Sequence, residues 1–154
     1  MNLFGLMETS GSAMQAERIR AEVVAANMAN AESTRTDTGG PYRRHHVVFA
    51  ANGDFEETMS KAQMRLSALG ASEQPESVGG VHIEQVIEDA SPPMKRYDPG
   101  HPDADAEGYV SYPDINPLTE MVDLMGATRA YGLNSSAVQA EKGMITSALE
   151  IARS

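Results

Sequence analysis

The C-terminal segment, residues 116–154, constrains the fold most because it can form one helix too long for a compact domain to enclose. Asn116 suits the N-cap and Pro117 the first helical position. A loose coiled-coil register of five heptads follows, made of Met121, Leu124, Thr128, Tyr131, Ser135, Val138, Lys142, Ile145, Leu149 and Ala152. A helix of ~36 residues measures about 54 Å. A compact domain of this length is roughly 40 Å across, so we expect the helix to protrude.

The N-terminal residues are the expected partner of this helix. Residues 3–31 are rich in Ala, Glu, Met and Arg, which favour a helix. Small and apolar residues form two adjacent stripes, one being Ser12, Ala16, Ile19, Val23, Ala26 and Asn30, and the other Phe4, Met7, Gly11, Met14, Arg18, Ala21, Ala25 and Met28. A kink or break is expected at Gly11, between two serines. A plain helical hairpin that buries its own seams is the alternative to packing against more than one neighbour.

The middle of the chain has the pattern of short strands and turns. Strands are predicted at 42–50, 81–88, 94–97 and 109–112, and a short helix at 55–69. The fold class expected is therefore mostly α with a small β insertion. Three parts follow, namely an N-terminal arm (1–35), a β-rich middle (36–115, with a variable stretch at 50–78) and a long C-terminal helix (116–154).

Composition excludes several functional classes. Twelve Lys and Arg face 22 Asp and Glu, and this net charge of −10 argues against a binder of nucleic acid or of anionic membranes. No cysteine is present, which excludes a disulfide scaffold and a thiolate nucleophile. No run of 18 apolar residues could insert into a membrane, and the N-terminus lacks the basic region of a cleavable signal. Leu, Ile, Val and Phe total 27 of 154 residues, so burial is expected to depend on partners.

One acidic stretch has the spacing of a calcium loop. Asp103, Asp105, Glu107 and Asp114 fall at ligand positions of the EF-hand pattern. Prolines before and within the stretch, however, oppose the flanking helices that an EF-hand needs. A turn with solvated carboxylates is therefore favoured, and a calcium-binding module is kept as the alternative. No nucleotide-binding or nucleophile motif occurs, so no enzymatic activity, cofactor or metal site is predicted.

Several strings resemble the bacterial flagellar rod and hook proteins. The N-terminal signature comprises Ser10-Gly11, Arg20, Asn27-Met28-Ala29-Asn30 and Thr34. GGPYRRHHVVF (39–49), GGVHIEQVIED (79–89), YDPGHPDADAEGYVSYPDI (97–115) and residues 120–149 are similar to a short proximal-rod member of that family. The resemblance implies a structural subunit that assembles helically into a drive shaft around an export channel, with paired antiparallel terminal helices. Another short rod or hook protein is the alternative.

The resemblance also implies partners, location and interface residues. The partners would be further copies within the rod, other proximal-rod proteins, the junction protein between the rod and the MS ring, and the distal rod. The location would be the periplasmic basal body, reached by flagellar type III export without a cleaved signal. For Arg20, Asn27 and Asn30, a polar clamp between subunits and a local helix cap are both open. The expected assembly residues are Gly11, Ile19, Arg20, Val23, Ala26, Asn27, Asn30, Asp98, Pro99, Gly100, Met121, Leu124, Arg129, Tyr131, Asn134, Val138 and Ile145.

Overall fold

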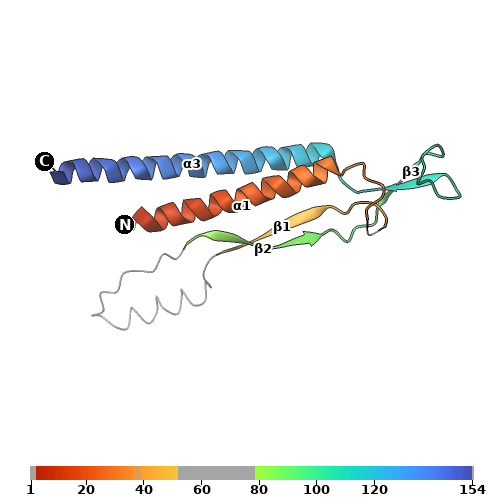
Figure 1. The fold of residues 1–154 in the computed structure, drawn as a ribbon, viewed down its shortest axis with the longest axis horizontal. Helices are drawn as coiled ribbons and strands as arrows, with labels where there is room; N and C mark the ends of the chain where they lie inside the picture. The colour runs from red at the N-terminus through yellow and green to blue at the C-terminus, as the bar shows by residue number, and fades with distance from the viewer. Residues whose placement is uncertain (1–2, 38, 52–78, 154) are drawn as a thin grey trace, which may run out of the picture.

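The computed structural model describes residues 3–37, 39–51 and 79–153. In chain order, one long helix comes first, four short strands follow, and a second long helix comes last (Figure 1). The elements are α1 (Leu3–Ala29), β1 (His45–Ala51), β2 (Val81–Glu88), β3 (Met94–Tyr97), β4 (Tyr109–Tyr112) and α3 (Pro117–Arg153). The helix predicted at 55–69 lies outside the described residues.

The two helices lie side by side, and both chain termini are at the same end of the molecule (Figure 1). Asn116 caps α3 as predicted, since its Oδ1 accepts a hydrogen bond from Leu118 N at 3.0 Å. With 37 residues against 27, α3 extends beyond α1 at its C-terminal end. The contact with α1 therefore supports only part of α3.

The break predicted at Gly11 does not occur, because α1 is one helix from Leu3 to Ala29. The neighbouring Ser12 connects this point of α1 to the β1–β2 pair. Its Oγ donates to Thr9 O at 2.8 Å and accepts a hydrogen bond from Val81 N at 3.1 Å. The weak point in the sequence is thus tied to the first residue of β2.

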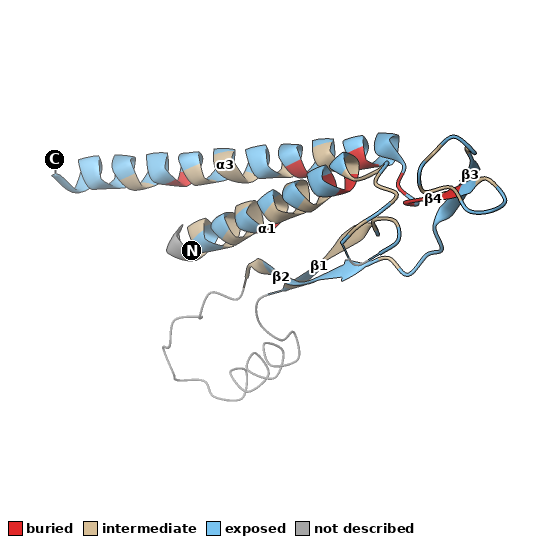
Figure 2. Cartoon of the chain, turned by 45° about the vertical axis from the view of Figure 1, so that its right-hand side comes forward, coloured by how far each residue is buried: buried red, intermediate tan, exposed pale blue. Residues whose placement is uncertain are grey.

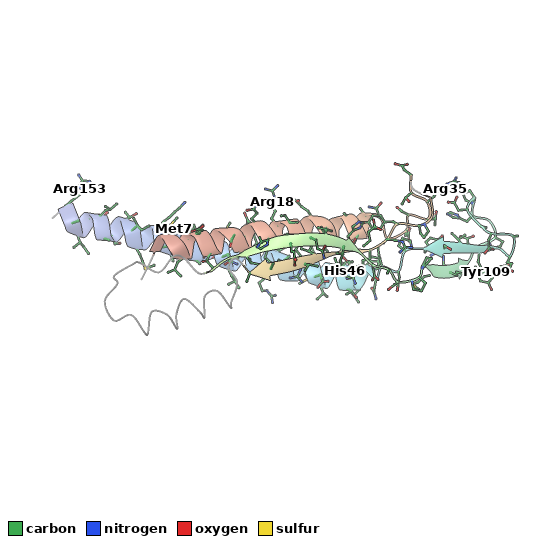
Figure 3. The ribbon with its side chains drawn as sticks, turned by 90° about the horizontal axis from the view of Figure 1, so that it is seen from below. Met7, Arg18, Arg35, His46, Tyr109 and Arg153 are labelled. Atoms are coloured by element: carbon green, nitrogen blue, oxygen red, sulfur yellow. The ribbon has the colours of Figure 1, made fainter. Side chains whose placement is uncertain are left out.

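The strands form two separate antiparallel pairs. β1 pairs with β2, from His45 opposite Glu88 to Ala51 opposite Val81, with an irregularity between Val48 and Phe49. β3 pairs with β4, and this ribbon lies at the opposite end of the molecule from the termini (Figure 1), as the labelled Tyr109 and Arg153 show (Figure 3). The β1–β2 pair packs against α1. β1 begins three residues later than predicted, because Tyr42 N donates to Ser33 O at 3.0 Å and not to a neighbouring strand.

The core is small. The buried apolar residues of the described part are Ala16, Val24, Val110, Tyr112, Ile115 and Ala127. Most of the buried positions gather where the helices approach the β3–β4 ribbon (Figure 2). Buried polar residues share the interior, namely Asn27, Glu120 and Glu141. Asn27 and Glu120 are hydrogen-bonded, whereas Oε2 of Glu141 has no hydrogen-bond partner, so the fold depends on the polar contacts of the first two as well as on apolar packing.

The seam of α3 differs from the predicted register at several positions, and Tyr131, Leu149 and Ala152 of that register are exposed. Leu124, Val138 and Ile145 are half-buried, as a seam requires. Glu120, Ala127 and Glu141 are buried, whereas Met121, Thr128 and Lys142, which the register placed in the seam, are exposed. The prediction followed apolar residues, but the seam here contains carboxylates, and the first of them has partners on α1 and in the segment before β1.

Candidate functional site

A polar junction lies where α1, β1 and α3 meet. Asn27, 1% exposed, comes from the last turns of α1. Its Nδ2 donates to His45 O at 2.9 Å, and its Oδ1 accepts from His45 N at 2.9 Å. The side-chain amide thus offers the first residue of β1 the donor and acceptor that a neighbouring strand would provide.

Glu120 closes the junction from the first turn of α3. It is 1% exposed, and its Oε2 accepts from Asn27 Nδ2 at 3.1 Å while its Oε1 accepts from Arg44 Nε at 2.7 Å. A buried carboxylate is tolerable when a cation and hydrogen bonds compensate its charge. The position of α3 is therefore coupled to α1 and to the residue that precedes β1.

Further charges extend the junction along the helix pair. Arg44 Nη2 lies 3.7 Å from Asp123 Oδ2, and Arg20 Nη2 lies 3.4 Å from Asp123 Oδ1. Arg20 also pairs with Glu17 at 3.6 Å. Two arginines thus share one carboxylate of α3, which aligns α1 with the start of α3.

Tyr42 packs beside the junction from the preceding turn. Its hydroxyl lies 3.2 Å from Asn27 Oδ1 and 2.8 Å from His45 Nδ1. Burial, with smaller effects from the charges of Glu88 and Glu120, raises the pKa of Tyr42 above its ordinary 10.0. The phenol therefore keeps its proton throughout the neutral range.

The structure brings two of the predicted clamp residues into one network, but not the third. Arg20 and Asn27 both connect α1 to other parts of the same chain. Asn30 instead donates to Ala26 O at 2.9 Å, which is a contact within the end of its own helix. Sequence reasoning selected neither Arg44 nor Glu120 as a site residue. The string YRRH (42–45) and an acidic residue in the first turn of α3 were the signals that could have indicated them.

The other predicted assembly residues are spread over the molecule. Some lie half-buried along the helices, namely Ile19, Val23, Leu124, Asn134, Val138 and Ile145. Others are exposed, namely Gly11, Ala26, Met121, Arg129 and Tyr131. Asp98, Pro99 and Gly100 begin the turn that leaves β3, where Asp98 N donates to Gly108 O at 2.9 Å. Only the exposed members are open to contact from outside the chain.

The calcium-like stretch forms the loop between β3 and β4. Asp105 Oδ1 accepts from Tyr109 N at 2.8 Å and from Glu107 N at 2.9 Å. These bonds, the one from Tyr109 foremost, lower the pKa of Asp105. Asp103 Oδ2 accepts from Thr34 Oγ1 at 2.8 Å. Both carboxylates therefore bind the backbone or the segment after α1, and the described residues contain no group of three or more His, Asp or Glu placed to hold a metal ion.

Neither α1 nor α3, over the residues that the structure describes, contains an apolar stretch long enough to cross a bilayer.

Comparison with known proteins identifies the family. A model described as flagella basal body rod protein matches residues 7–35, and one described as flagellar basal body rod FlgEFG protein C-terminal matches residues 106–151. The flagellar basal-body rod protein FlgC of Bacillus subtilis is 40% identical over 157 residues, which cover 99% of this chain and 100% of that protein. The chain belongs to the FlgC family of flagellar basal-body rod proteins.

Two further FlgC proteins agree over nearly the whole length. That of Borreliella burgdorferi is 35% identical, and that of Escherichia coli O6:H1 is 36% identical, each covering 98% of both chains. The two family models together match most of α1, β4 and nearly all of α3. Asn27, Asp123 and Glu120 all lie within these matched segments, whereas Arg44 lies outside them.

Proposed function

We propose that this chain is a structural, non-enzymatic subunit of the proximal part of the flagellar rod, where it assembles helically into the drive shaft and export channel. The observation that carries this proposal is the near-complete match, at 32–40% identity, to proteins named flagellar basal-body rod protein FlgC. Those proteins are similar over 98% or more of this chain, so the likeness includes the middle as well as the terminal helices.

An exposed apolar face on α3 supports assembly. Six large apolar residues recur at helical spacing on the side away from α1, with exposed fractions of 69% for Leu118, 61% for Val122, 62% for Met125, 67% for Leu133, 52% for Met144 and 76% for Ile151. A helix with apolar residues on more than one side must pack against other elements on more than one side to bury its apolar surface. A neighbouring subunit would supply that cover.

The paired helices are the proposed building unit. We infer that α1 and α3 act as an antiparallel coiled coil, supported by the Arg20–Asp123 ion pair and the Asn27–Glu120 hydrogen bond. Residues 1–35 and 116–154 would then be the assembling arms, and residues 36–115 a separate middle part. The polar junction would fix the angle between the arms and the middle.

Location and partners follow from the same proposal. The subunit would act in the periplasmic basal body, after type III export without a cleaved signal. The small core suits a chain that travels unfolded, because little stability has to be overcome before export. Further copies, other proximal-rod proteins, the junction protein at the MS ring and the distal rod would be its neighbours.

A complementation experiment tests the function. The source bacterium would be deleted for this gene and supplied with the tagged chain or with Val122→Asp, which places a charge on the exposed apolar face. The wild-type chain should restore swimming and co-purify with basal bodies, and Val122→Asp should do neither. Thr146→Asp, also exposed on α3 but about 120° around the helix from Val122, is the control and should restore both. Normal swimming in the deletion strain would contradict the proposed function.

A further inference from the structure

The methionines of the two helices differ in their exposure. The described methionines of α1 are half-buried, namely Met7, Met14 and Met28. Every methionine of α3 is exposed, at 49% for Met121, 62% for Met125 and 52% for Met144. A thioether is oxidised only where an oxidant can reach its sulfur. The sulfurs of α3 are therefore open to oxidants in the free chain, and those of α1 are largely shielded.

Two of the exposed methionines belong to one apolar cluster at the start of α3. The cluster has the spacing i, i+3, i+4 and i+7 and consists of Leu118, Met121, Val122 and Met125. Its other two members are exposed as well, Leu118 at 69% and Val122 at 61%. At about 100° per residue, Met125 points about 140° away from the buried Glu120. Two thioethers thus make up half of an apolar cluster that α1 leaves open to solvent.

We propose that Met121 and Met125 are a modification site, at which hydrogen peroxide oxidises the free subunit and thereby prevents its entry into the rod. This inference rests on the proposed rod function, in which a neighbouring subunit packs against the exposed side of α3. In the reaction the sulfur attacks one oxygen of the peroxide and the O–O bond breaks. An S=O bond forms, and the second oxygen takes both hydrogens and leaves as water. The sulfur loses two electrons, and the peroxide is reduced by the same two.

A sulfoxide changes which surfaces the cluster can pack against. Its oxygen is a polar hydrogen-bond acceptor, and burial against an apolar partner leaves that oxygen without a donor. We expect each unpaired oxygen to weaken the association about tenfold or more. Sulfurs that are already packed against a neighbour are shielded, so the oxidation selects subunits that have not yet assembled. Methionine sulfoxide reductases restore the thioether, which makes the modification reversible.

Limited oxidation of the purified chain tests the site itself. The full chain is treated with hydrogen peroxide, and the sulfoxides are located by mass spectrometry of its peptides. We expect Met121 and Met125 to react about fivefold faster or more than the half-buried methionines of α1. Equal rates in the two helices would overturn the inference, and this measurement does not depend on assembly.

Assembly after a pulse of hydrogen peroxide tests the consequence in cells. In the deletion strain, the amount of tagged wild-type chain in newly formed basal bodies should fall about fivefold or more after the pulse. The double variant Met121→Leu with Met125→Leu keeps the apolar surface but cannot form a sulfoxide, so its amount should not fall. Met94→Leu is the matched control and should fall as the wild type does, because Met94 is 58% exposed but lies on β3, outside the cluster. A double leucine variant that falls as far as the wild type would overturn the inference.

Glutamine substitutions give an independent readout, because glutamine is polar and close in length to methionine sulfoxide. The double variant Met121→Gln with Met125→Gln should abolish swimming without peroxide, and Met94→Gln should leave it unchanged. Circular dichroism of the purified variants verifies that the helices persist. Normal swimming of the double glutamine variant would show that the cluster tolerates polar groups and would also overturn the inference. Failure of the untreated wild-type chain to enter basal bodies would instead contradict the rod function itself.

Discussion

The side-chain amide of Asn27 pairs with both backbone polar groups of His45, at 2.9 Å each, so that a residue of α1 acts as the neighbour of an edge strand. The same amide donates to the buried Glu120 at 3.1 Å. One side chain therefore connects three segments that are far apart in sequence. No other residue type offers a donor and an acceptor in this geometry except glutamine, whose additional methylene would displace them.

Replacing Asn27 should weaken the fold strongly. Asn27→Ala removes the partners of His45 N and O and one partner of Glu120, all inside the junction. Each buried group left without a partner costs about 1–3 kcal/mol, and we expect the free energy of unfolding to fall by about 2–4 kcal/mol. Urea denaturation followed by circular dichroism measures it. Asn30→Ala, which removes only local bonds, to Ala26 O and from Ser33 Oγ, is the matched control and should cost less than about 1 kcal/mol.

The Arg44–Glu120 ion pair should contribute less to the free energy of unfolding than the loss caused by replacing one partner alone suggests. Arg44→Met leaves the buried Glu120 without its cation and should destabilise the chain by about 3–5 kcal/mol. Adding Glu120→Met removes the uncompensated charge, so the double variant should recover part of that loss. A double-mutant cycle in urea measures the coupling. A double variant as unstable as the sum of the two single variants would show that the two groups act independently.

The acid titration of Asp89 tests the hydrogen bonds that its carboxylate accepts in the turn after β2. Hydrogen bonds from Ser91, with a smaller contribution from His46, lower the pKa of Asp89 from 3.8 to about 2. Because the folded state holds the ionised form more tightly, this contribution to stability is complete above pH 3.8 and is lost as the pH falls through about 2. Ser91→Ala should raise the pKa toward its ordinary value, and His46→Gln should raise it less. Carboxyl NMR titration measures both, and an unchanged pKa in Ser91→Ala would refute the assignment.

Gly108 should tolerate no side chain in the β3–β4 ribbon. Its φ is +83°, and a Cβ there would meet Tyr97 Cε2 at 2.8 Å and Pro99 Cβ at 3.3 Å. Gly108→Ala should therefore disturb the contact between the Tyr97 and Tyr109 rings, whose centroids are 5.4 Å apart. Near-ultraviolet circular dichroism of the tyrosines reports on this change. Gly100→Ala is the control, because its Cβ would meet only Asp98 Oδ1, at 3.8 Å, and it should keep the wild-type spectrum.

Ala26→Leu should block assembly and leave the subunit folded. Ala26 is exposed on α1, so added bulk meets no residue of its own chain in the seam. If a neighbouring helix packs there, overpacking costs typically about 1–3 kcal/mol at each repeat of the contact. Swimming and basal-body isolation measure assembly, and thermal unfolding of the purified variant measures the fold. Normal swimming would show that Ala26 does not face a packed neighbour.

Local patterns in the sequence determined the elements of this protein. Asn116 and Pro117 specify the start of α3, because a cap and a proline act on the adjacent turn alone. The strands at 81–88, 94–97 and 109–112 were predicted at the residues that the structure assigns them. The scarcity of large aliphatic residues predicted a small core. The strings resembling rod proteins predicted the family.

Tertiary structure alone decided how the helices face each other. The apolar register favoured Met121 for the seam, yet Glu120 is buried there because Asn27 and Arg44, which lie 93 and 76 residues away in sequence, supply its hydrogen bonds. The periodicity of a sequence shows where apolar side chains recur. It does not show whether a distant residue compensates the charge of a buried carboxylate. Close to Gly11, Ser12 of α1 likewise accepts a hydrogen bond from Val81 N, a contact between distant residues that no local pattern predicts. Long-range pairing of polar groups, acting together with apolar packing, thus determines which face of α3 points inward at its start.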